Sequence, residues 1–450
     1  MTLSPFKNRK YIWILPLLAA VFLAFFVRYG YIEANDSWAF IEGNLRVSPL
    51  YAMVVRFFTG IFGEETGLSL IALLQDLLTA YAIFSLTVCL SGRFDMPPVF
   101  TVLLSLVFVA AYLLRLVMVG KESLYCNTIL SEGLTFPFYF LFLKYLFFAW
   151  DNKSFKYLLT ATILCFVLSS TRGQLTNTFI SVIVIFFILL KHRTERKGYL
   201  LRGIITTACF FACLSLLSCT WHWISSGLFT PTTMGKEAVL GGVLYTSRSE
   251  DAALLSEGSE EKILYEKSMK QGEKDGLTYL SAPGDPIGAF KHYEASHDTL
   301  RDYLCDAVAE RYGEDNEDNV HFLVGSFANA VLPTLLKKNI GHYLKNCLVN
   351  AFGGIVRSNS IMSNVGAVWS FLVYAVSIGM TVLFGKKEEF EGEKKLILLI
   401  LLLILVNCIF CSFGVFELSR YVYYNFPCIY MAILIGLFGL ISRRSERGKR

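Results

Sequence analysis

The chain has 450 residues, of which 54% are hydrophobic, 15% aromatic and only 17% charged, and its mean hydropathy is +0.52. Soluble proteins usually carry about 25% charged residues, and here the apolar residues occur in long uninterrupted blocks. This composition excludes an ordinary cytosolic enzyme, a disordered chain and a nucleic-acid-binding protein. We predict an all-α polytopic membrane protein.

The formal net charge of +5 is distributed unevenly along the sequence. Nineteen of the 36 acidic residues lie between Glu237 and Asp318, together with eight lysines and arginines, so this segment carries a charge of −11. The rest of the chain is therefore basic. Most of the eleven cysteines lie within apolar runs as small hydrophobic residues, and no disulfide framework is expected.

Ten apolar segments approach the length of about 20 residues that a helix needs to cross a bilayer core of roughly 30 Å. The fifth is short, so we expect about ten transmembrane helices, in a range of roughly nine to twelve. The segments are Tyr11–Val27, Leu68–Leu90, Val99–Val119, Leu134–Trp150, Tyr157–Ser170, Leu175–Leu190, Gly203–Ile224, Gly366–Phe384, Leu396–Phe413 and Phe426–Ile441.

Lysine and arginine in the connections predict the orientation of the chain, because cytoplasmic loops are enriched in them. With the N-terminus inside, the inner connections hold 20 lysines and arginines and the short outer loops hold six. An even number of spans then places both termini in the cytoplasm. The first span follows Lys7, Arg9 and Lys10 and is typical of an uncleaved signal anchor. We expect a bacterial plasma membrane protein.

Three regions follow from this topology. Residues 1–224 form an N-terminal transmembrane module with a first outer loop at 28–66. Residues 225–365 form a long, acidic extracytoplasmic region, in which Thr299–Tyr312, His321–Leu336 and His342–Phe352 show the spacing of amphipathic helices. Residues 366–450 supply the last transmembrane helices and a basic cytoplasmic tail.

The first outer loop carries the residues best suited to chemistry. It contains the carboxylates Glu33, Asp36 and Glu42, then Arg46, and returns to the membrane through Pro49-Leu-Tyr51. A carboxylate at a partly dehydrated membrane edge can take a proton from an acceptor hydroxyl, and a nearby arginine can bind a phosphate bidentately. The alternative is that these are solvated loop acids beside an interfacial helix.

Charged residues also occur at the outer ends of later spans. These are Lys121, Ser131-Glu132, Thr171-Arg172 and Arg420-Tyr421. Each alone fits interfacial anchoring, with arginine extending to the headgroups and tyrosine in the aromatic belt. Their complementary signs on the same face as Asp36 favour a functional site, because ionisable groups at membrane depth are functional candidates.

The order of these motifs resembles that of the GT-C superfamily of membrane glycosyltransferases, which use polyprenyl-phosphate sugars. The closest likeness is to its protein-mannosyltransferase-like and aminoarabinose-transferase-like bacterial branch. The resemblance covers residues 1–190 and 340–440, whereas the acidic segment has no counterpart. The chain departs from the pattern where one acid replaces an adjacent pair in the first loop, and where Gly173 replaces the usual proline. The matching residues are Asp36, Pro49-Leu-Tyr51, Ser131-Glu132, Thr171-Arg172 and Arg420-Tyr421 with Pro427.

The resemblance implies a GT-C-like helix bundle and a single inverting displacement at the outer leaflet. Asp36 would act as the general base, and Glu132 would orient a donor or acceptor hydroxyl. Arg46, Arg172 or Arg420 would hold the lipid phosphate, with Tyr51 and Tyr421 beside it. Glu33, Glu42 and Lys121 are secondary candidates.

The implied partners are a polyprenyl-phosphate sugar donor, the lipid bilayer and an extracytoplasmic protein, lipid or glycan acceptor, with no nucleic acid. No cofactor is required by this chemistry. A divalent cation at Glu314-Asp-Asn-Glu-Asp318 stays open, although the segment lacks the spacing of a calcium loop and fits a solvated loop better.

Ionisable residues inside the spans must face the bundle. Asp76, in the second span, is expected to pair with a basic residue, while Arg115 reaches the outer interface and Lys144 lies in the fourth span. Two other functions compete with the glycosyltransferase. One is a polymerase or ligase of lipid-linked polysaccharide, for which an outer loop rich in arginine and histidine is expected. The other is a transporter, for which ionisable groups near the bilayer midplane are expected.

Overall fold

The computed structural model describes residues 5, 9–414 and 419–447. In these ranges the chain forms α-helices and short 3₁₀ helices, and no β-strand. The helices of the first half are α1 (Ile14–Tyr29), α2 (Ser37–Glu42), α3 (Pro49–Phe62), α4 (Glu64–Arg93), α5 (Pro98–Val119), α6 (Glu132–Asp151), α7 (Phe155–Thr171), α8 (Thr178–Leu190) and α9 (Arg196–Ser226). Those of the second half are α10 (Met234–Thr246), α11 (Glu260–Lys274), α12 (Pro286–Tyr312), α13 (Glu317–Arg357), α14 (Asn364–Phe384), α15 (Glu391–Ser412), α16 (Ser419–Val422) and α17 (Asn425–Arg447).

Nine helices of the described residues have the length and apolar composition to cross a membrane, as in a polytopic membrane protein. Eight of them coincide with predicted spans, namely α4, α5, α6, α8, α9, α14, α15 and α17. The other two predicted spans are α1 and α7, which are apolar helices of 16 and 17 residues. All ten predicted segments are therefore helices.

The ninth helix of this length, α13, was not predicted as a span. It joins the two amphipathic helices expected at His321–Leu336 and His342–Phe352 into one element of 41 residues. Asn339 lies between them with non-helical backbone angles (φ −102°, ψ 15°), so the helix is kinked at the predicted break. After the kink, α13 packs against α14 and α15.

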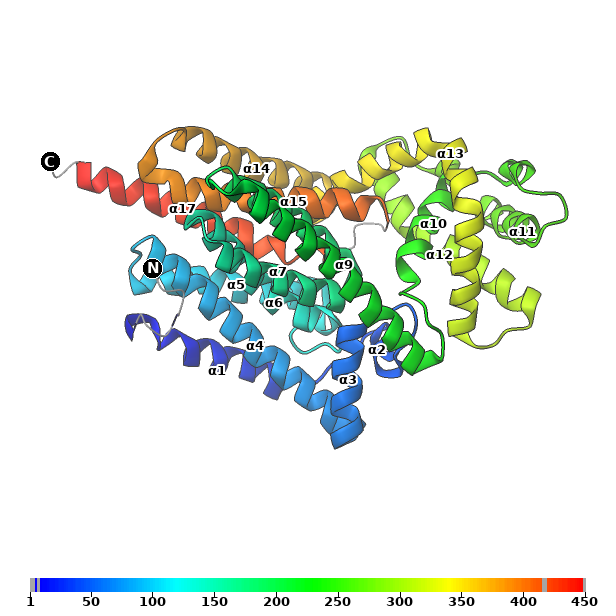
Figure 1. Cartoon of the computed structure of the whole chain (residues 1–450), viewed down its shortest axis with the longest axis horizontal. Helices are drawn as coiled ribbons and strands as arrows, with labels where there is room; N and C mark the ends of the chain where they lie inside the picture. Colours follow the sequence, from blue (N-terminus) through cyan, green and yellow to red (C-terminus); the bar gives the residue numbers. More distant parts are fainter. Residues whose placement is uncertain (1–4, 6–8, 415–418, 448–450) are drawn as a thin grey trace.

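The two ends of the molecule differ in kind. Helix α1 begins and α17 ends at the left-hand end in Figure 1, while α10, α11, α12 and the first half of α13 form a separate helical region at the right-hand end. The acidic segment predicted to be extracytoplasmic is therefore gathered at the end opposite the chain termini. We call the left-hand end the terminal end and the right-hand end the outer end.

The bundle core is centred on α4 and α6. Their most apolar stretches are 72% and 83% buried, against 6% for α9. Large aromatic residues fill the space between them and α5, including Phe84, Phe108 and Phe140. Such side chains bury much apolar area each, and they explain why α6, with a phenylalanine-rich sequence, lies at the centre. The exposed apolar face of α9 is left at the periphery.

The helical region at the outer end has its own hydrophobic core. Leu240, Tyr265, Leu304 and Val324 of α10 to α13 meet there. Helix α12 begins at a capping side chain: Asp285 accepts the Gly288 N–H, ahead of Pro286 at the first helical position, and α11 and α13 are capped in the same way by Ser259 and Asn316. Side-chain oxygens at these positions satisfy N–H groups that have no partner within the helix. The region is therefore a folded unit.

Three ionisable residues of the spans, Asp76, Lys144 and Arg115, have polar partners. Asp76 accepts a hydrogen bond from Asn127 Nδ2 (3.2 Å), so its partner is an amide rather than the expected basic residue. Lys144 donates to Ser85 Oγ (2.7 Å) within the core. Arg115 donates to the Tyr125 hydroxyl (2.6 Å) near the outer end.

Candidate functional site

Four charged side chains from distant parts of the chain meet at the outer end of the bundle. Arg172 Nη1 lies 2.5 Å from Glu132 Oε1, and Arg420 Nε lies 3.6 Å from the same oxygen. Arg420 Nη2 also lies 2.6 Å from Asp36 Oδ2. The order along the cluster is therefore Arg172, Glu132, Arg420, Asp36. The sequence predicted all four residues for one site.

The two carboxylates differ in accessibility. The Glu132 side chain is 2% exposed and that of Asp36 is 52% exposed. Ser131 Oγ donates to the second oxygen of Glu132 (3.2 Å), so both of its oxygens are engaged. Glu132 thus acts as the buried counter-ion of two arginines, while Asp36 presents a carboxylate to the outside.

Tyr421 supports both arginines. The guanidinium carbon of Arg172 lies 4.4 Å from the centre of the Tyr421 ring and that of Arg420 lies 5.4 Å from it, both distances typical of cation–π contacts. The Tyr421 backbone is fixed in turn, because its carbonyl accepts a hydrogen bond from Asn407 Nδ2 (3.1 Å). Tyr421, which was predicted at the site, therefore helps to hold both guanidinium groups in place.

Backbone pairing of two outer loops brings Asp36 to Glu132. Ile32 and Thr128 form an isolated parallel bridge, through hydrogen bonds from Ile32 N–H to Asn127 O (3.0 Å) and from Ile129 N–H to Ile32 O (2.8 Å). Ser37, next to Asp36, donates from Oγ to Ile129 O (2.8 Å). The start of α2 is thereby held beside the start of α6.

Tyr51 has a structural place beneath the same loops. Its side chain is fully buried, and its hydroxyl lies 2.8 Å from the amide of Gln75 in α4. With its oxygen toward Tyr51, this amide donates to the carbonyls of Cys126 (3.2 Å) and Thr128 (3.3 Å). Tyr51 was predicted to lie beside the lipid phosphate; in the structure its hydroxyl is engaged with Gln75, beneath the loop that leads to Glu132.

Helix α3 is also tied to the arginine segment. The Gly173 N–H donates to Ser48 Oγ (2.9 Å), immediately after Arg172 and immediately before Pro49. Sequence reasoning missed this contact and those of Gln75 and Asn407. The signal available for Gln75 was a polar side chain within an apolar span, which indicates a buried partner but not which one.

Comparisons of the chain with protein-family models, curated proteins and solved structures found no match in any of the three. The likeness in motif order to the GT-C superfamily therefore stays an expectation from the sequence.

The secondary candidates are not members of this cluster. Glu33, Glu42 and Lys121 are exposed, and the ion pairs of the cluster join other residues. Glu42 closes α2 at the end away from Asp36.

Arg46 faces the helical region at the outer end. Its carbonyl accepts a hydrogen bond from Thr232 Oγ1 (3.0 Å), and its charge acts on Glu237 and Asp298. Burial alone would raise the pKa of Glu237, but the hydrogen bond from His321 Nδ1 (3.0 Å) and the nearby Arg46 hold that pKa below its ordinary value. The Arg46 backbone is therefore tied to the segment that precedes α10, and the ion pairs of Glu132 are made by Arg172 and Arg420.

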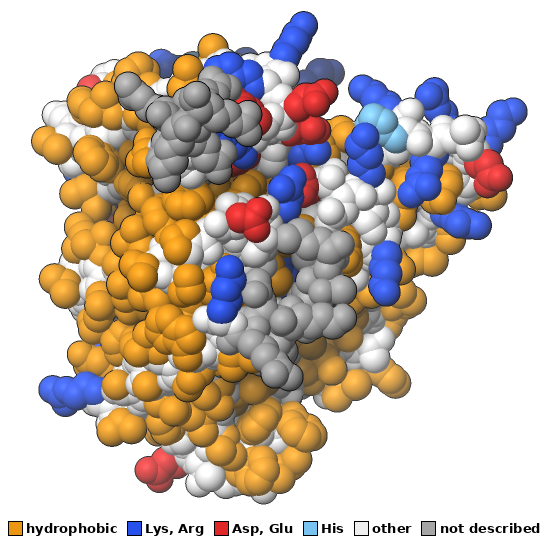
Figure 2. Space-filling model, turned by 90° about the vertical axis from the view of Figure 1, so that its left-hand side faces the viewer, with side chains coloured by type: hydrophobic (Ala, Val, Ile, Leu, Met, Phe, Trp, Pro, Cys, Tyr) orange, Lys and Arg blue, Asp and Glu red, His pale blue; other side chains and the backbone are white. Residues whose placement is uncertain are grey.

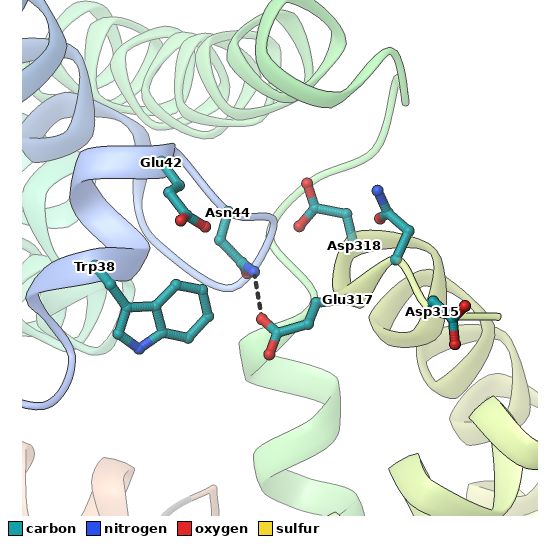
Figure 3. A pocket seen from close by; sticks show the side chains of 7 residues that line it. Trp38, Glu42, Asn44, Asp315, Glu317 and Asp318 are labelled. Atoms are coloured by element: carbon teal, nitrogen blue, oxygen red, sulfur yellow. Dashed lines mark hydrogen bonds between the residues drawn. The ribbon is translucent and has the colours of Figure 1, made fainter.

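A groove of about 530 Å³ lies between the first outer loop and the start of α13. In Figure 3, Trp38, Glu42 and Asn44 lie on one side of it and Glu317 and Asp318 on the other. Two hydrogen bonds cross it, from Asn44 Nδ2 to Glu317 (3.4 Å) and from Leu45 N–H to Asp318 (2.8 Å). The acidic start of α13 thus holds the loop that carries Asp36.

The segment considered for a divalent cation is engaged in local hydrogen bonds. Glu314 accepts from Asn316 N–H (3.0 Å) and from Asn319 Nδ2 (3.1 Å). In the part of the chain that the structure describes, no group of three or more histidine, cysteine, aspartate or glutamate residues is arranged to hold a metal ion.

Proposed function

We propose that the protein is an integral membrane glycosyltransferase that moves a sugar from a polyprenyl-phosphate donor to an acceptor outside the cytoplasm. The observation that supports this function best is the cluster itself. It places an accessible carboxylate, Asp36, beside the arginine pair Arg172 and Arg420, at the outer end of a bundle of membrane-length helices. The motif order of the sequence points to the same chemistry.

The arginine pair would bind the phosphate of the lipid donor. The Arg420 side chain is 27% exposed and that of Arg172 is 11% exposed, so Arg420 is the more accessible of the two to a ligand. Planar guanidinium groups bind phosphate oxygens bidentately. Because Tyr421 and Glu132 already hold these groups in place, little side-chain entropy remains to be lost when the phosphate binds.

Asp36 would act as the general base. As the acceptor oxygen forms its bond to the anomeric carbon, Asp36 takes the hydroxyl proton. The bond between the anomeric carbon and the phosphate oxygen breaks at the same time, and its electron pair leaves on the phosphate. The arginines stabilise the charge that develops there. One displacement of this kind inverts the anomeric centre.

The ion pair between Asp36 and Arg420 suggests how the base is released. In the free protein Arg420 Nη2 is engaged with Asp36, so one oxygen of this carboxylate is occupied by the ion pair. A donor phosphate would compete for Arg420 and free Asp36 next to the bound sugar. Glu132 keeps Arg420 in place during this exchange, so its proposed role is to position the arginines rather than to touch the substrate.

The same proposal places the protein in a bacterial plasma membrane with both termini in the cytoplasm. The excess of lysine and arginine in the connections at the terminal end supports this orientation. The Asp36 site then faces the extracytoplasmic side, where lipid-linked sugars are used.

The experiment is sugar transfer by the purified protein in lipid, from radiolabelled polyprenyl-phosphate sugars to a pool of cell-envelope acceptors. Asp36→Asn is expected to lower the rate by about 10²–10⁴-fold, as loss of a general base does. Glu42→Gln, an exposed acid in the same loop, is the matched control and should retain activity. Transfer that survives unchanged in Asp36→Asn contradicts the proposed base.

One outcome favours a different function. An arginine pair also suits a pyrophosphate, so a polymerase or ligase of lipid-linked polysaccharide remains the second candidate. If no prenyl-phosphate sugar is used and prenyl-pyrophosphate glycans are consumed instead, the site belongs to that class.

A further inference from the structure

Two kinds of cation occur at the terminal end of the bundle. Those between α4, α6, α15 and α17 are held by acids. Arg93 lies 2.5 Å from Asp151, and Arg443 lies 2.8 Å from Glu393. These ion pairs join neighbouring helices, so the charges of these arginines are neutralised within the protein.

The connection between α8 and α9 has a different character. Residues 191–202 contain five lysines and arginines and one acid. Ion pairs between described residues at this end involve Arg93, Lys395 and Arg443, but none of these five. Four of the five are exposed and Arg193 is half-buried. We call this set the basic patch; its members are Lys191, Arg193, Arg196, Lys197 and Arg202.

The basic patch is partly fixed in geometry. Arg196 donates from Nη2 to the Lys191 carbonyl (3.2 Å) and from Nε to the Arg193 carbonyl (3.3 Å), just beyond the last turn of α8. Arg193 lies 5.1 Å from the ring centre of Phe155 and 5.3 Å from that of Tyr199. These two rings are stacked at 4.5 Å, so they form an aromatic support where α7, α8 and α9 meet.

An apolar surface adjoins the basic patch. The most apolar stretch of α9 is only 6% buried, and Leu200, Leu201, Ile204 and Ile205 of its first turns are all exposed. Figure 2 faces the terminal end, where Lys and Arg side chains gather with a histidine on one lobe. Unneutralised cations next to exposed leucine and isoleucine match the two halves of a lipid, an anionic headgroup and its acyl chains.

We propose that the basic patch binds an anionic phospholipid of the leaflet at the terminal end, with its phosphate on Arg193 and its neighbours and its chains along the start of α9. The five cations outweigh the single acid of this connection, and no carboxylate of the described residues competes for them as Asp151 and Glu393 do for Arg93 and Arg443. The site is independent of the proposed sugar transfer.

The experiment measures lipid retention by the purified full-length chain, using native mass spectrometry after exchange into phosphatidylglycerol or phosphatidylcholine. Phosphatidylglycerol is expected to remain bound and phosphatidylcholine to be lost. Lys191→Gln/Lys197→Gln should weaken phosphatidylglycerol binding by at least about fivefold for each cation removed. Both lysines are exposed, so this variant is expected to fold. Lys386→Gln/Lys387→Gln removes the same charge at the same end and should bind as the wild type does.

Three results would overturn the proposal. Equal retention of phosphatidylglycerol by both double variants would show that the basic patch is not the site. Equal retention of the two lipids by the wild type would remove the headgroup requirement. Displacement of the lipid by millimolar inorganic phosphate would indicate a site for a soluble anion instead. Arg193→Gln, with its folding checked by circular dichroism, gives a second test of the same phosphate contact.

Discussion

Asp36 and Glu132 contact the same arginine yet differ in exposure, 52% against 2%. An exposed ion pair contributes little to stability, whereas a buried charge that loses its partner is costly. The two carboxylates should therefore separate function from folding. On the proposed function, Asp36 would serve the chemistry and Glu132 would hold the arginines in place.

Neutral variants of these two residues test that separation. Glu132→Gln leaves Arg172 and Arg420 close together without their counter-ion, so we expect it to lower the free energy of unfolding by about 3–5 kcal/mol. Asp36→Asn is expected to change it by about 1 kcal/mol or less. Denaturation followed by fluorescence in detergent measures both. Equal destabilisation by the two variants would contradict the distinction.

The sequence predicted which charged residues lie near the site better than it predicted where their side chains point. Asp36, Glu132, Arg172, Arg420 and Tyr421 were predicted at the outer ends of spans, and topology alone brings such residues to one face. The orientation of the Arg46 side chain depends on how residues 43–48 pack against α10 and α13. No local sequence pattern predicts that packing.

At the scale of elements, the site depends on the close approach of α4 and α6. Gly133, the second residue of α6, leaves the space in which the Gln75 amide reaches Tyr51 and the loop at 126–128. A Cβ atom at Gly133 would lie 2.2 Å from Gln75 Nε2, far inside contact distance. A side chain at this position would therefore require the Gln75 amide to move.

Gly133→Ala should expel the Gln75 amide from its place. We expect a loss of about 1–3 kcal/mol in the free energy of unfolding, as for overpacked cores, together with reduced sugar transfer. Gly379→Ala in α14 is the matched control, because no atom lies within 4 Å of its new Cβ. There the change is expected to stabilise the helix by roughly 1 kcal/mol. Thermal unfolding of the two variants should therefore shift in opposite directions, and a shift in the same direction would contradict this account.

Helices were predicted well where an apolar run determines the element. They were predicted less well where tertiary contacts determine how two helices meet. Each of the ten apolar segments is a helix, including the short α7. The two predicted amphipathic segments are the two halves of α13; what was not predicted is that they meet directly at a kink, where Asn339 has non-helical backbone angles. Asn339 here donates to Asp251 (2.9 Å) and Ser247 (3.2 Å).

For the whole molecule, the helical region at the outer end and the membrane bundle are joined through the first outer loop. Residues 44–46 of that loop follow α2 and Asp36. The Leu45 N–H donates to Asp318, the Arg46 carbonyl accepts a hydrogen bond from Thr232, and the charge of Arg46 lowers the pKa of Glu237. The stability of the outer region and the position of Asp36 are therefore coupled.

The pH dependence of this junction has a defined sign. The pKa values of Glu237 and Asp298 lie below their ordinary values of 4.5 and 3.8 in the folded chain. Each group therefore contributes stability that is present above its ordinary pKa and is lost as the pH falls through its lower, folded value. Thermal unfolding should show constant stability near neutral pH and a decline below about pH 4.5.

Glu237→Gln checks the origin of that decline. The variant should be less stable at pH 7, because His321 and Arg46 lose a buried partner, and its stability should depend less on pH below pH 4.5. An unchanged acid profile in the variant would place the titrating groups elsewhere.

The central claim is that Arg172 and Arg420 hold a phosphate beside Asp36. The measurement that tests it most directly is the affinity of the purified protein for a polyprenyl phosphate, compared among wild type, Arg420→Gln and Asp36→Asn. We predict that Arg420→Gln weakens binding at least about tenfold, since a charge-assisted contact is lost. Asp36→Asn should bind as tightly as the wild type or more tightly, because the competing carboxylate is gone, while sugar transfer collapses. Unchanged binding in Arg420→Gln, or weakened binding in Asp36→Asn, would contradict the account.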